Sequence, residues 1–305
     1  MPAGLAAISH VQTGRFSGHL WEQIDLPLFA GRDPVISLCN TGPVAVRRTL
    51  TCVHDANVWL APGSYSRAFR STYRVLLPSL LRGPRSWITV SRHSEAELLR
   101  IGVARRPAAA VTPCGSDHAK SWDPARSRLK AADLPSRFVF GLASRSPAKN
   151  TGLLAELARR LAPAGISVVA AGSPNARVFG APCARAPSPL VELGRVSDDD
   201  IALLMSRAIC FVFPSRQEGF GLPPLEAMAL GSPVVASDRA AMPEVLGDAA
   251  ILLSPDEPDA FAAAILRLAA DRDARADLIR RGRERAACFA WRDSAAAILD
   301  LAAGL

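Results

Sequence analysis

Short runs of apolar and β-branched residues alternate with amphipathic stretches of helical length along the chain. This alternation predicts βαβ units, because neighbouring parallel strands need a long crossover connection that a helix usually supplies. Four strands are expected in the first half, at residues 35–39, 49–54, 87–90 and 109–112. Six are expected in the second half, at residues 137–142, 166–171, 190–193, 209–213, 233–236 and 250–253. The predicted fold class is therefore α/β with parallel sheets.

Between these strands the apolar residues recur at helical spacing. The segment 150–161 carries Leu153, Leu154, Leu157 and Leu161 on one face. The segment 198–208 opens with three aspartates, which suit the N-terminus of a helix. Helices are expected at residues 20–29, 66–81, 95–101, 150–161, 198–208, 256–270, 273–289 and 293–301.

The chain of 305 residues has the length of two such domains. Polar residues together with Pro124 and Pro135 interrupt the pattern at residues 117–136, where we expect the linker. The predicted division is an N-terminal domain at residues 1–130, a C-terminal domain at 131–292 and a closing helix at 293–305. Ligands of such sheets bind beyond the carboxyl ends of the strands, so residues that follow strands are the candidates for a site.

The net charge of +8 is distributed unevenly. Residues 1–130 carry 17 Lys and Arg against 8 Asp and Glu, whereas residues 131–305 carry 19 against 20. Nine arginines lie in the segment 65–106, at Arg67, Arg70, Arg74, Arg82, Arg85, Arg92, Arg100, Arg105 and Arg106. Such a segment could attract an anionic membrane, a nucleic acid or an acidic substrate, or it could be an ordinary solvated helix face.

Several classes of protein are disfavoured by what the sequence lacks. It has no run of about 18 apolar residues, and its first residues do not form a basic region followed by a long apolar stretch. A cytosolic protein is therefore expected. The cysteines are scattered singly, which suggests neither a zinc site nor a disulfide framework but small buried side chains in a reducing compartment. They are Cys39, Cys52, Cys114, Cys183, Cys210 and Cys288.

The most distinctive stretch runs from a strand through a glycine-rich loop into a helix, at residues 211–235. Gly219 and Gly221 allow the backbone to pass close to a ligand. Pro223 and Pro224 fit the first turn of the following helix, where no amide donor is lost. The free amides of that helix N-terminus predict an anion site that suits a phosphate or pyrophosphate.

Two glutamates, Glu218 and Glu226, flank this loop. The intervening turn places them at different ends of a ligand, so they are not expected to act as a paired acid and base. Each carboxylate suits two neighbouring hydroxyls of a sugar or ribose. Taken singly, Glu218 could be a solvated loop charge, and Glu226 could complement the dipole in the first turn of the helix.

The stretch EGFGLPPLEAMALGSPVVAS, residues 218–237, closely resembles the E-x7-E signature of retaining glycosyltransferases of family 4, which have the two-domain GT-B fold. Further segments share the resemblance: HDA at 54–56, RSTYRVLLPSLLR at 70–82, ITVSRHSEAEL at 88–98, GSD at 115–117, GLASRSPAKN at 141–150, LGRVSDDDIALLMSRA at 193–208 and PEVLGDAA at 243–250. The resemblance implies two Rossmann-like domains, with the nucleotide sugar bound by the C-terminal one. Sequences that resemble this one include mannosyltransferases and other hexosyltransferases of bacterial polysaccharide assembly.

The resemblance also implies roles for individual residues. Glu218 would contact hydroxyls of the donor sugar and Glu226 the ribose. Lys149, with Arg145 as a second cation, would stabilise the diphosphate as it gains charge on leaving. Backbone amides for the sugar and diphosphate would come from Gly219, Phe220, Gly221 and Leu222.

Two further positions follow from the same resemblance. His54, at the carboxyl end of a predicted strand, would face the donor sugar from the N-terminal domain, and Asp55 beside it would orient the ring or bind acceptor. Val196 would meet the nucleotide base through its backbone. A lone histidine is more often structural, and Val196 could equally be a packing residue.

The implied reaction moves a hexose from a nucleotide sugar to an acceptor hydroxyl with retention. No carboxylate is an evident nucleophile for a double displacement, so the resemblance favours a route in which the departing diphosphate accepts the acceptor's proton. No D-x-D motif stands where a metal would bridge to the diphosphate, and the run Asp198, Asp199, Asp200 is better explained by a helix N-terminus. We expect no metal and no cofactor, with GDP-mannose or a UDP-hexose as the donor substrate.

The expected acceptor is lipid-linked or an oligosaccharide, and no nucleic-acid partner is expected. The arginine-rich segment 65–106 would hold the protein peripherally at the inner face of the cytoplasmic membrane. By the same resemblance we expect the N-terminal domain to lack the first βαβ unit of this family, because WEQIDLP at 21–27 resembles the helix that normally follows that unit.

Other functions stay open at this stage. A non-catalytic nucleotide-sugar-binding or scaffold subunit of the same fold is the main alternative, and an epimerase acting on the nucleotide sugar is another. A nicotinamide dehydrogenase is disfavoured, because no G-x-G-x-x-G follows a predicted strand.

Overall fold

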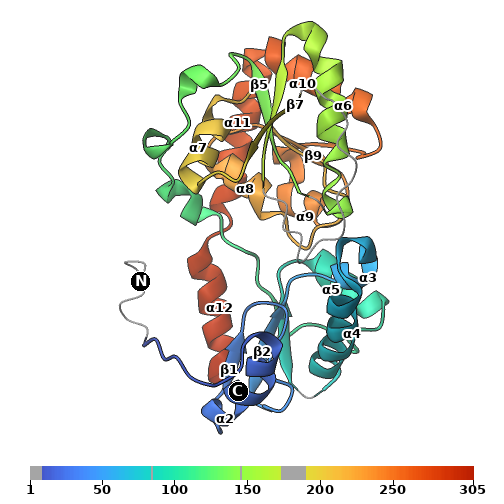
Figure 1. Cartoon of the computed structure of the whole chain (residues 1–305), viewed down its shortest axis with the longest axis vertical. Coiled ribbons are helices and arrows are strands. Elements are labelled where there is room, and N and C mark those ends of the chain that lie inside the picture. Colours follow the sequence, from blue (N-terminus) through green and yellow to red (C-terminus); the bar gives the residue numbers. More distant parts are fainter. Residues whose placement is uncertain (1–8, 84, 145, 173–189) are drawn as a thin grey trace.

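The computed structural model describes residues 9–83, 85–144, 146–172 and 190–305. It contains two parallel sheets in separate lobes, one above the other in Figure 1. The sheet of the first lobe has the order β1-β2-β3-β4, and its strands are β1 (Val35–Ser37), β2 (Thr49–Val53), β3 (Ser86–Thr89) and β4 (Ala110–Val111). All four strands expected in the first half are confirmed.

The sheet of the second lobe has six parallel strands in the order β10-β9-β8-β5-β6-β7. They are β5 (Phe138–Leu142), β6 (Ser167–Ala171), β7 (Leu190–Gly194), β8 (Phe211–Phe213), β9 (Val234–Ser237) and β10 (Ile251–Leu253), which confirms the six expected strands. The strands β5, β8 and β9 at the middle of the sheet are almost wholly buried, as continuous apolar strands covered by helices on both faces should be.

The longer helices lie close to where the apolar periodicity predicts them, whereas the short helices at residues 57–60 and 242–246 were not expected. In the first lobe they are α1 (Gly18–Leu20), α2 (Leu26–Ala30), α3 (Asn57–Leu60), α4 (Arg67–Leu81) and α5 (Arg92–Arg100). The later helices are α6 (Gly152–Leu161), α7 (Asp198–Arg207), α8 (Leu222–Ala229), α9 (Met242–Leu246), α10 (Pro258–Ala270), α11 (Arg272–Ala287) and α12 (Trp291–Ala303).

Two helices differ from their predicted form. The expected helix at residues 20–29 is interrupted, because Trp21–Asp25 form a wider π-helical turn before α2. Pro27, which lacks an amide hydrogen, follows at this junction. Helix α5 begins three residues earlier than expected, since the Ser91 hydroxyl accepts a hydrogen bond from the Ser94 amide at 3.0 Å and caps it.

The buried core extends over both lobes. Trp87 and Ile88 of β3 are buried in the first lobe, and Phe140 and Phe211 are buried at the centre of the second sheet. The expectation of buried cysteines holds for Cys52, Cys114 and Cys210, whereas it is wrong for Cys39 and Cys288, which are exposed; Cys183 lies outside the described residues. In the ranges described, no helix has the length and apolar character needed to cross a membrane.

The chain passes between the lobes twice. Residues 112–137 lead from the first sheet to the second through short 3₁₀ turns, including Asp117–Ser121. After α11 the chain returns, and α12 runs beside the first sheet, so that the C-terminus lies in the lower lobe of Figure 1. The Ser294 hydroxyl of α12 donates to the Pro113 carbonyl, and Arg48 Nε donates to the Leu305 carbonyl at 2.9 Å.

Candidate functional site

The glycine-rich loop connects buried β8 to α8 in the centre of the second sheet. Gly221 precedes α8 with a φ of +94°, a left-handed conformation that favours glycine. Within the described parts of the chain, the backbone amides of Gly219, Phe220, Gly221 and Leu222 donate no hydrogen bond. The four amides predicted to hold the sugar and diphosphate are therefore unpaired, as donors that await a ligand would be.

Gly219 is also one of the positions at which the two lobes contact each other. A Cβ at this position would strike the carbonyl oxygen of His54, which directly follows β2. The Gly219 carbonyl accepts hydrogen bonds from the hydroxyls of Ser91, at 2.6 Å, and Ser94, at 3.0 Å. The Ser94 hydroxyl lies 2.8 Å from the His54 carbonyl as well. The carboxyl ends of the two sheets thus face each other at this loop.

Ser91 and Ser94 were not predicted as site residues. The sequence offers one signal for them, the serine pair in ITVSRHSEAEL, which reads as the N-terminal cap of α5. A local cap of this kind would not reveal their second contact. Their contact with Gly219 joins residues 128 and 125 positions apart, which no local pattern specifies.

Glu218 and Lys149 form an ion pair, with Lys149 Nζ 2.5 Å from Glu218 Oε1. The Glu218 side chain is 11% exposed and that of Lys149 36% exposed. Lys149 ends a 3₁₀ turn after β5, and the Ala148 carbonyl of that turn accepts from the Ser215 hydroxyl at 3.0 Å and the Arg216 amide at 2.7 Å. The structure thus brings the predicted sugar carboxylate and the predicted diphosphate cation together. The second predicted cation, Arg145, lies outside the described residues.

His54 and Asp55 lie next to this pair. The His54 ring donates from Nε2 to the Leu38 carbonyl at 2.7 Å, since a carbonyl can only accept. Among the described residues, Nδ1 of that ring has no hydrogen-bond partner. Burial raises the pKa of the Asp55 carboxyl, the Asn57 amide opposes that rise, and the nearby charge of Glu218 adds to it. The first lobe therefore brings the Asp55 side chain close to the glycine loop, whereas the His54 ring is hydrogen-bonded to the Leu38 carbonyl of its own lobe.

Glu226 lies in the second turn of α8, so the alternative in which it complements the dipole from the first turn is wrong. Its side chain is 12% exposed, and its Oε1 accepts a hydrogen bond from His118 Nε2 at 3.0 Å. Burial raises the pKa of Glu226, while the hydrogen bond from His118 acts to lower it. His118, which the sequence did not single out, follows the GSD segment at 115–117.

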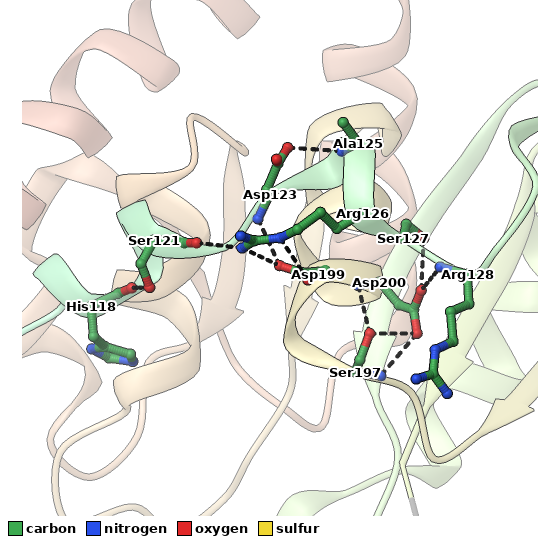
Figure 2. Close-up of polar contacts among 10 residues, drawn as sticks. All are labelled: His118, Ser121, Asp123, Ala125, Arg126, Ser127, Arg128, Ser197, Asp199 and Asp200. Atoms are coloured by element: carbon green, nitrogen blue, oxygen red, sulfur yellow. Dashed lines mark hydrogen bonds and ion pairs between the residues drawn. The ribbon is translucent and has the colours of Figure 1, made fainter. Parts of the chain in front are cut away.

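Val196 lies between β7 and α7, half-buried against the core, at the carboxyl end of its strand. The aspartate run after it opens α7, as predicted. Asp199 and Asp200 point toward residues 121–129 of the linker (Figure 2). Asp199 pairs with Arg126 at 3.1 Å. In the described ranges, no group of three or more His, Cys, Asp or Glu side chains is placed to hold a metal ion.

The linker is fastened to α7 by Asp200, which is 4% exposed. Its Oδ1 accepts from the Ser127 hydroxyl and the Arg128 amide, both at 2.7 Å, and from the Leu129 amide at 3.3 Å. Its Oδ2 accepts from the amide and hydroxyl of Ser197 at 2.9 and 2.7 Å (Figure 2). The loop that carries Val196 is therefore held in place by the same carboxylate that holds the linker.

Comparison with known proteins places this site in a family. The family model described as glycosyl transferases group 1 matches residues 133–285. The O-antigen chain mannosyltransferase B of Escherichia coli is 46% identical over 99 residues, which are 32% of this chain and 26% of that protein. The aligned part thus spans about a quarter of the length of that relative.

Solved structures with the GT-B fold resemble most of the chain, including parts of both lobes. Sucrose-phosphate synthase from Thermosynechococcus elongatus superposes with a TM-score of 0.66 at 24% identity, covering 84% of this chain and 67% of that one. HepE of Anabaena, solved in complex with UDP-glucose, superposes with a TM-score of 0.64 at 21% identity, covering 84% and 72%. The expected GT-B fold is confirmed. The chain belongs to the glycosyl transferases group 1 family.

Proposed function

We propose that the chain is a retaining, metal-independent hexosyltransferase that moves a sugar from a nucleotide donor to an acceptor hydroxyl in the assembly of a polysaccharide or lipid-linked glycan. The observation that carries the proposal is the meeting of Lys149 and Glu218 beside the unpaired amides of the glycine loop. A cation and free amides suit a diphosphate, and a carboxylate suits sugar hydroxyls. The three groups lie together at the carboxyl ends of β5 and β8.

In the proposed reaction the bond between the anomeric carbon and the diphosphate oxygen breaks. The acceptor oxygen bonds to the same face of that carbon, and its proton goes to the departing diphosphate. Lys149 and the amides of residues 219–222 stabilise the negative charge that develops on the diphosphate, and so act more strongly on the transition state than on the bound donor. Binding of the diphosphate would draw Lys149 away from Glu218 and leave that carboxylate free for the sugar.

GDP-mannose is the proposed donor and a UDP-hexose the second choice. The name of the Escherichia coli relative supports mannose, and the complex of HepE with UDP-glucose supports a nucleotide-sugar donor in general. Glu226 would bind the ribose and Val196 the base, while His54 and Asp55 would face the sugar and the acceptor from the first lobe.

The proposed acceptor is lipid-linked or an oligosaccharide. Several arginines of the segment 65–106 are already used within the lobe, because Arg82, Arg85 and Arg106 donate to backbone carbonyls. Arg67 and Arg74 lie exposed on α4, and exposed Val75 lies beside them. This face of α4 combines positive charge with an apolar side chain, which supports adsorption to an anionic membrane.

The test is transfer by the purified chain from a panel of nucleotide sugars to lipid-linked and oligosaccharide acceptors, with the anomeric configuration of the product read by NMR. We expect Lys149→Ala and Glu218→Ala to abolish transfer, and Lys130→Ala, which removes an exposed lysine of the linker, to leave it unchanged. Donor binding without transfer to any acceptor would refute the proposed activity and favour a non-catalytic subunit. A changed nucleotide sugar formed without acceptor would indicate an epimerase instead.

A further inference from the structure

We propose that His118 is a positioning residue that holds Glu226 in the orientation in which it binds the donor's ribose, and that Trp291 of α12 fixes His118 for this task. The inference rests on the proposed function. It adds a residue of the linker and a residue of the returning helix to the donor site.

The hydrogen bonds at the two ring nitrogens of His118 determine which nitrogen carries the proton. Trp291 Nε1 lies 2.9 Å from His118 Nδ1, and an indole nitrogen can only donate. His118 Nδ1 is therefore unprotonated and accepts this bond. The proton of the neutral ring is then on Nε2, which lies 3.0 Å from Glu226 Oε1 and donates to it. Trp291 thus selects the tautomer that Glu226 needs.

The ring of His118 is fixed from several sides. Its centroid lies 5.5 Å from that of Trp122 in an edge-to-face contact and 6.1 Å from that of Trp291. The backbone amide of Trp291 donates to Asp117 Oδ1 at 2.8 Å, which holds the start of α12 against the turn that carries His118. The imidazole has a defined position before any ligand arrives, which is what a residue that orients another must have.

Among the described residues, only one of the two oxygens of the Glu226 carboxylate has a hydrogen-bond partner. His118 takes Oε1, and within the described residues no donor reaches Oε2. Since burial raises the pKa of Glu226 and the His118 bond opposes that rise, His118 also favours the charged carboxylate, which is the better acceptor for hydroxyl donors. A ribose hydroxyl would find Oε2 both oriented and unoccupied.

Two substitutions of His118 each remove one of its two hydrogen bonds and keep the other. The amide nitrogen of a glutamine takes the place of Nε2, so H118Q keeps the donor to Glu226 and loses the acceptor for Trp291. The amide oxygen of an asparagine takes the place of Nδ1, so H118N keeps the contact with Trp291 and loses the donor to Glu226. The readouts are the affinities for GDP and UDP by titration calorimetry, the separate kcat and KM for the nucleotide sugar, and the thermal unfolding temperature.

We expect H118N to weaken binding of the nucleoside diphosphate about tenfold, the usual effect of one lost hydrogen bond, and to raise KM while kcat stays near that of the wild type. We expect H118Q to bind within about threefold of the wild type. Equal affinities of H118N and H118Q would overturn the proposal, because a merely structural histidine lowers the unfolding temperature without distinguishing the two. If H118N does not fold, W291F provides the test, because it removes the donor that fixes the tautomer of His118. Its KM should then rise several-fold at unchanged kcat, and an unchanged KM overturns the proposal.

Glu226→Gln separates a failure of this inference from a failure of the proposed function. Loss of nucleotide binding in E226Q together with full binding in H118N refutes only the role of His118. Full binding in E226Q refutes the assignment of Glu226 to the ribose, and with it the inference that depends on this assignment.

Discussion

Removing the Asp200 carboxylate should destabilise the protein more than any other single change in the acidic run at the start of α7. The buried carboxylate accepts five hydrogen bonds, three from residues 127–129 and two from Ser197. In D200A the serine hydroxyls can turn toward other acceptors, but the amides of Arg128, at 2.7 Å, and Ser197, at 2.9 Å, cannot. A hydrogen bond to a charged group contributes about 1.5 kcal/mol or more, so the two amides alone predict a loss of about 3 kcal/mol.

The effect should depend on pH in a defined direction. Burial alone would raise the pKa of Asp200, but the hydrogen bonds from Ser127, Ser197 and Arg128 outweigh it and hold the pKa well below its usual range. A carboxyl whose folded-state pKa is depressed stabilises the protein fully above its unfolded-state pKa of about 3.9, and this stabilisation is lost as the pH falls toward the folded-state pKa. The difference between wild type and D200A should therefore be constant from pH 7 to about 5 and shrink below about 4.

The assay is urea unfolding of the wild type, D200A and D198A across this pH range. Asp198 is the matched control, because it lies in the same helical turn with an exposed side chain. We expect D198A to unfold within about 0.5 kcal/mol of the wild type. A loss below about 1 kcal/mol in D200A at pH 7, or a difference that grows in acid, would refute the reasoning.

Two further predictions concern contacts between the two lobes, and a third concerns adsorption to a membrane. Gly219→Ala should lower both the unfolding temperature and the rate of transfer, because its Cβ would strike the His54 carbonyl; an unchanged variant would contradict the close approach at this loop. Glu244→Ala removes a carboxylate that accepts from two backbone amides at the start of α5, at 2.8 and 2.9 Å, and should cost about 1 kcal/mol in urea unfolding, whereas no loss would mean that this cap contributes nothing. The protein should sediment with anionic vesicles at low salt and be released as salt rises, and Arg67→Ala with Arg74→Ala should weaken this adsorption; binding that ignores lipid charge would contradict it.

The pattern of the sequence predicts the sheets well for a physical reason. Most strands of the second sheet are short apolar runs, and the longer helices carry their own periodicity, so both signals lie within a few residues of one another. The same holds for the loop at residues 218–221, whose glycines and following prolines specify a turn and a helix start locally. The division into domains at residues 130 and 292 stays a prediction.

The contacts that build the site were harder to predict, because they join residues far apart in the chain. Lys149 and Glu218 are separated by 69 positions, and His118 and Glu226 by 108. The motif places Lys149 and Glu218 at the ends of neighbouring strands, which is why their common location could be expected. His118 belongs to a linker without strand or helix periodicity. Its partner is therefore determined only by how the linker packs against α8 in the folded protein.

Helix α12 ties the last residues of the chain to a lobe whose other elements are made first. Ser294 reaches Pro113 across 181 positions, and Arg48 reaches Leu305 across 257. A growing chain can therefore complete its second sheet before the first lobe receives its closing helix, although the first lobe leaves the ribosome earlier. Contacts of such long sequence separation form slowly, so we expect α12 to dock late in folding, and a variant without residues 291–305 should lose these contacts with the first lobe.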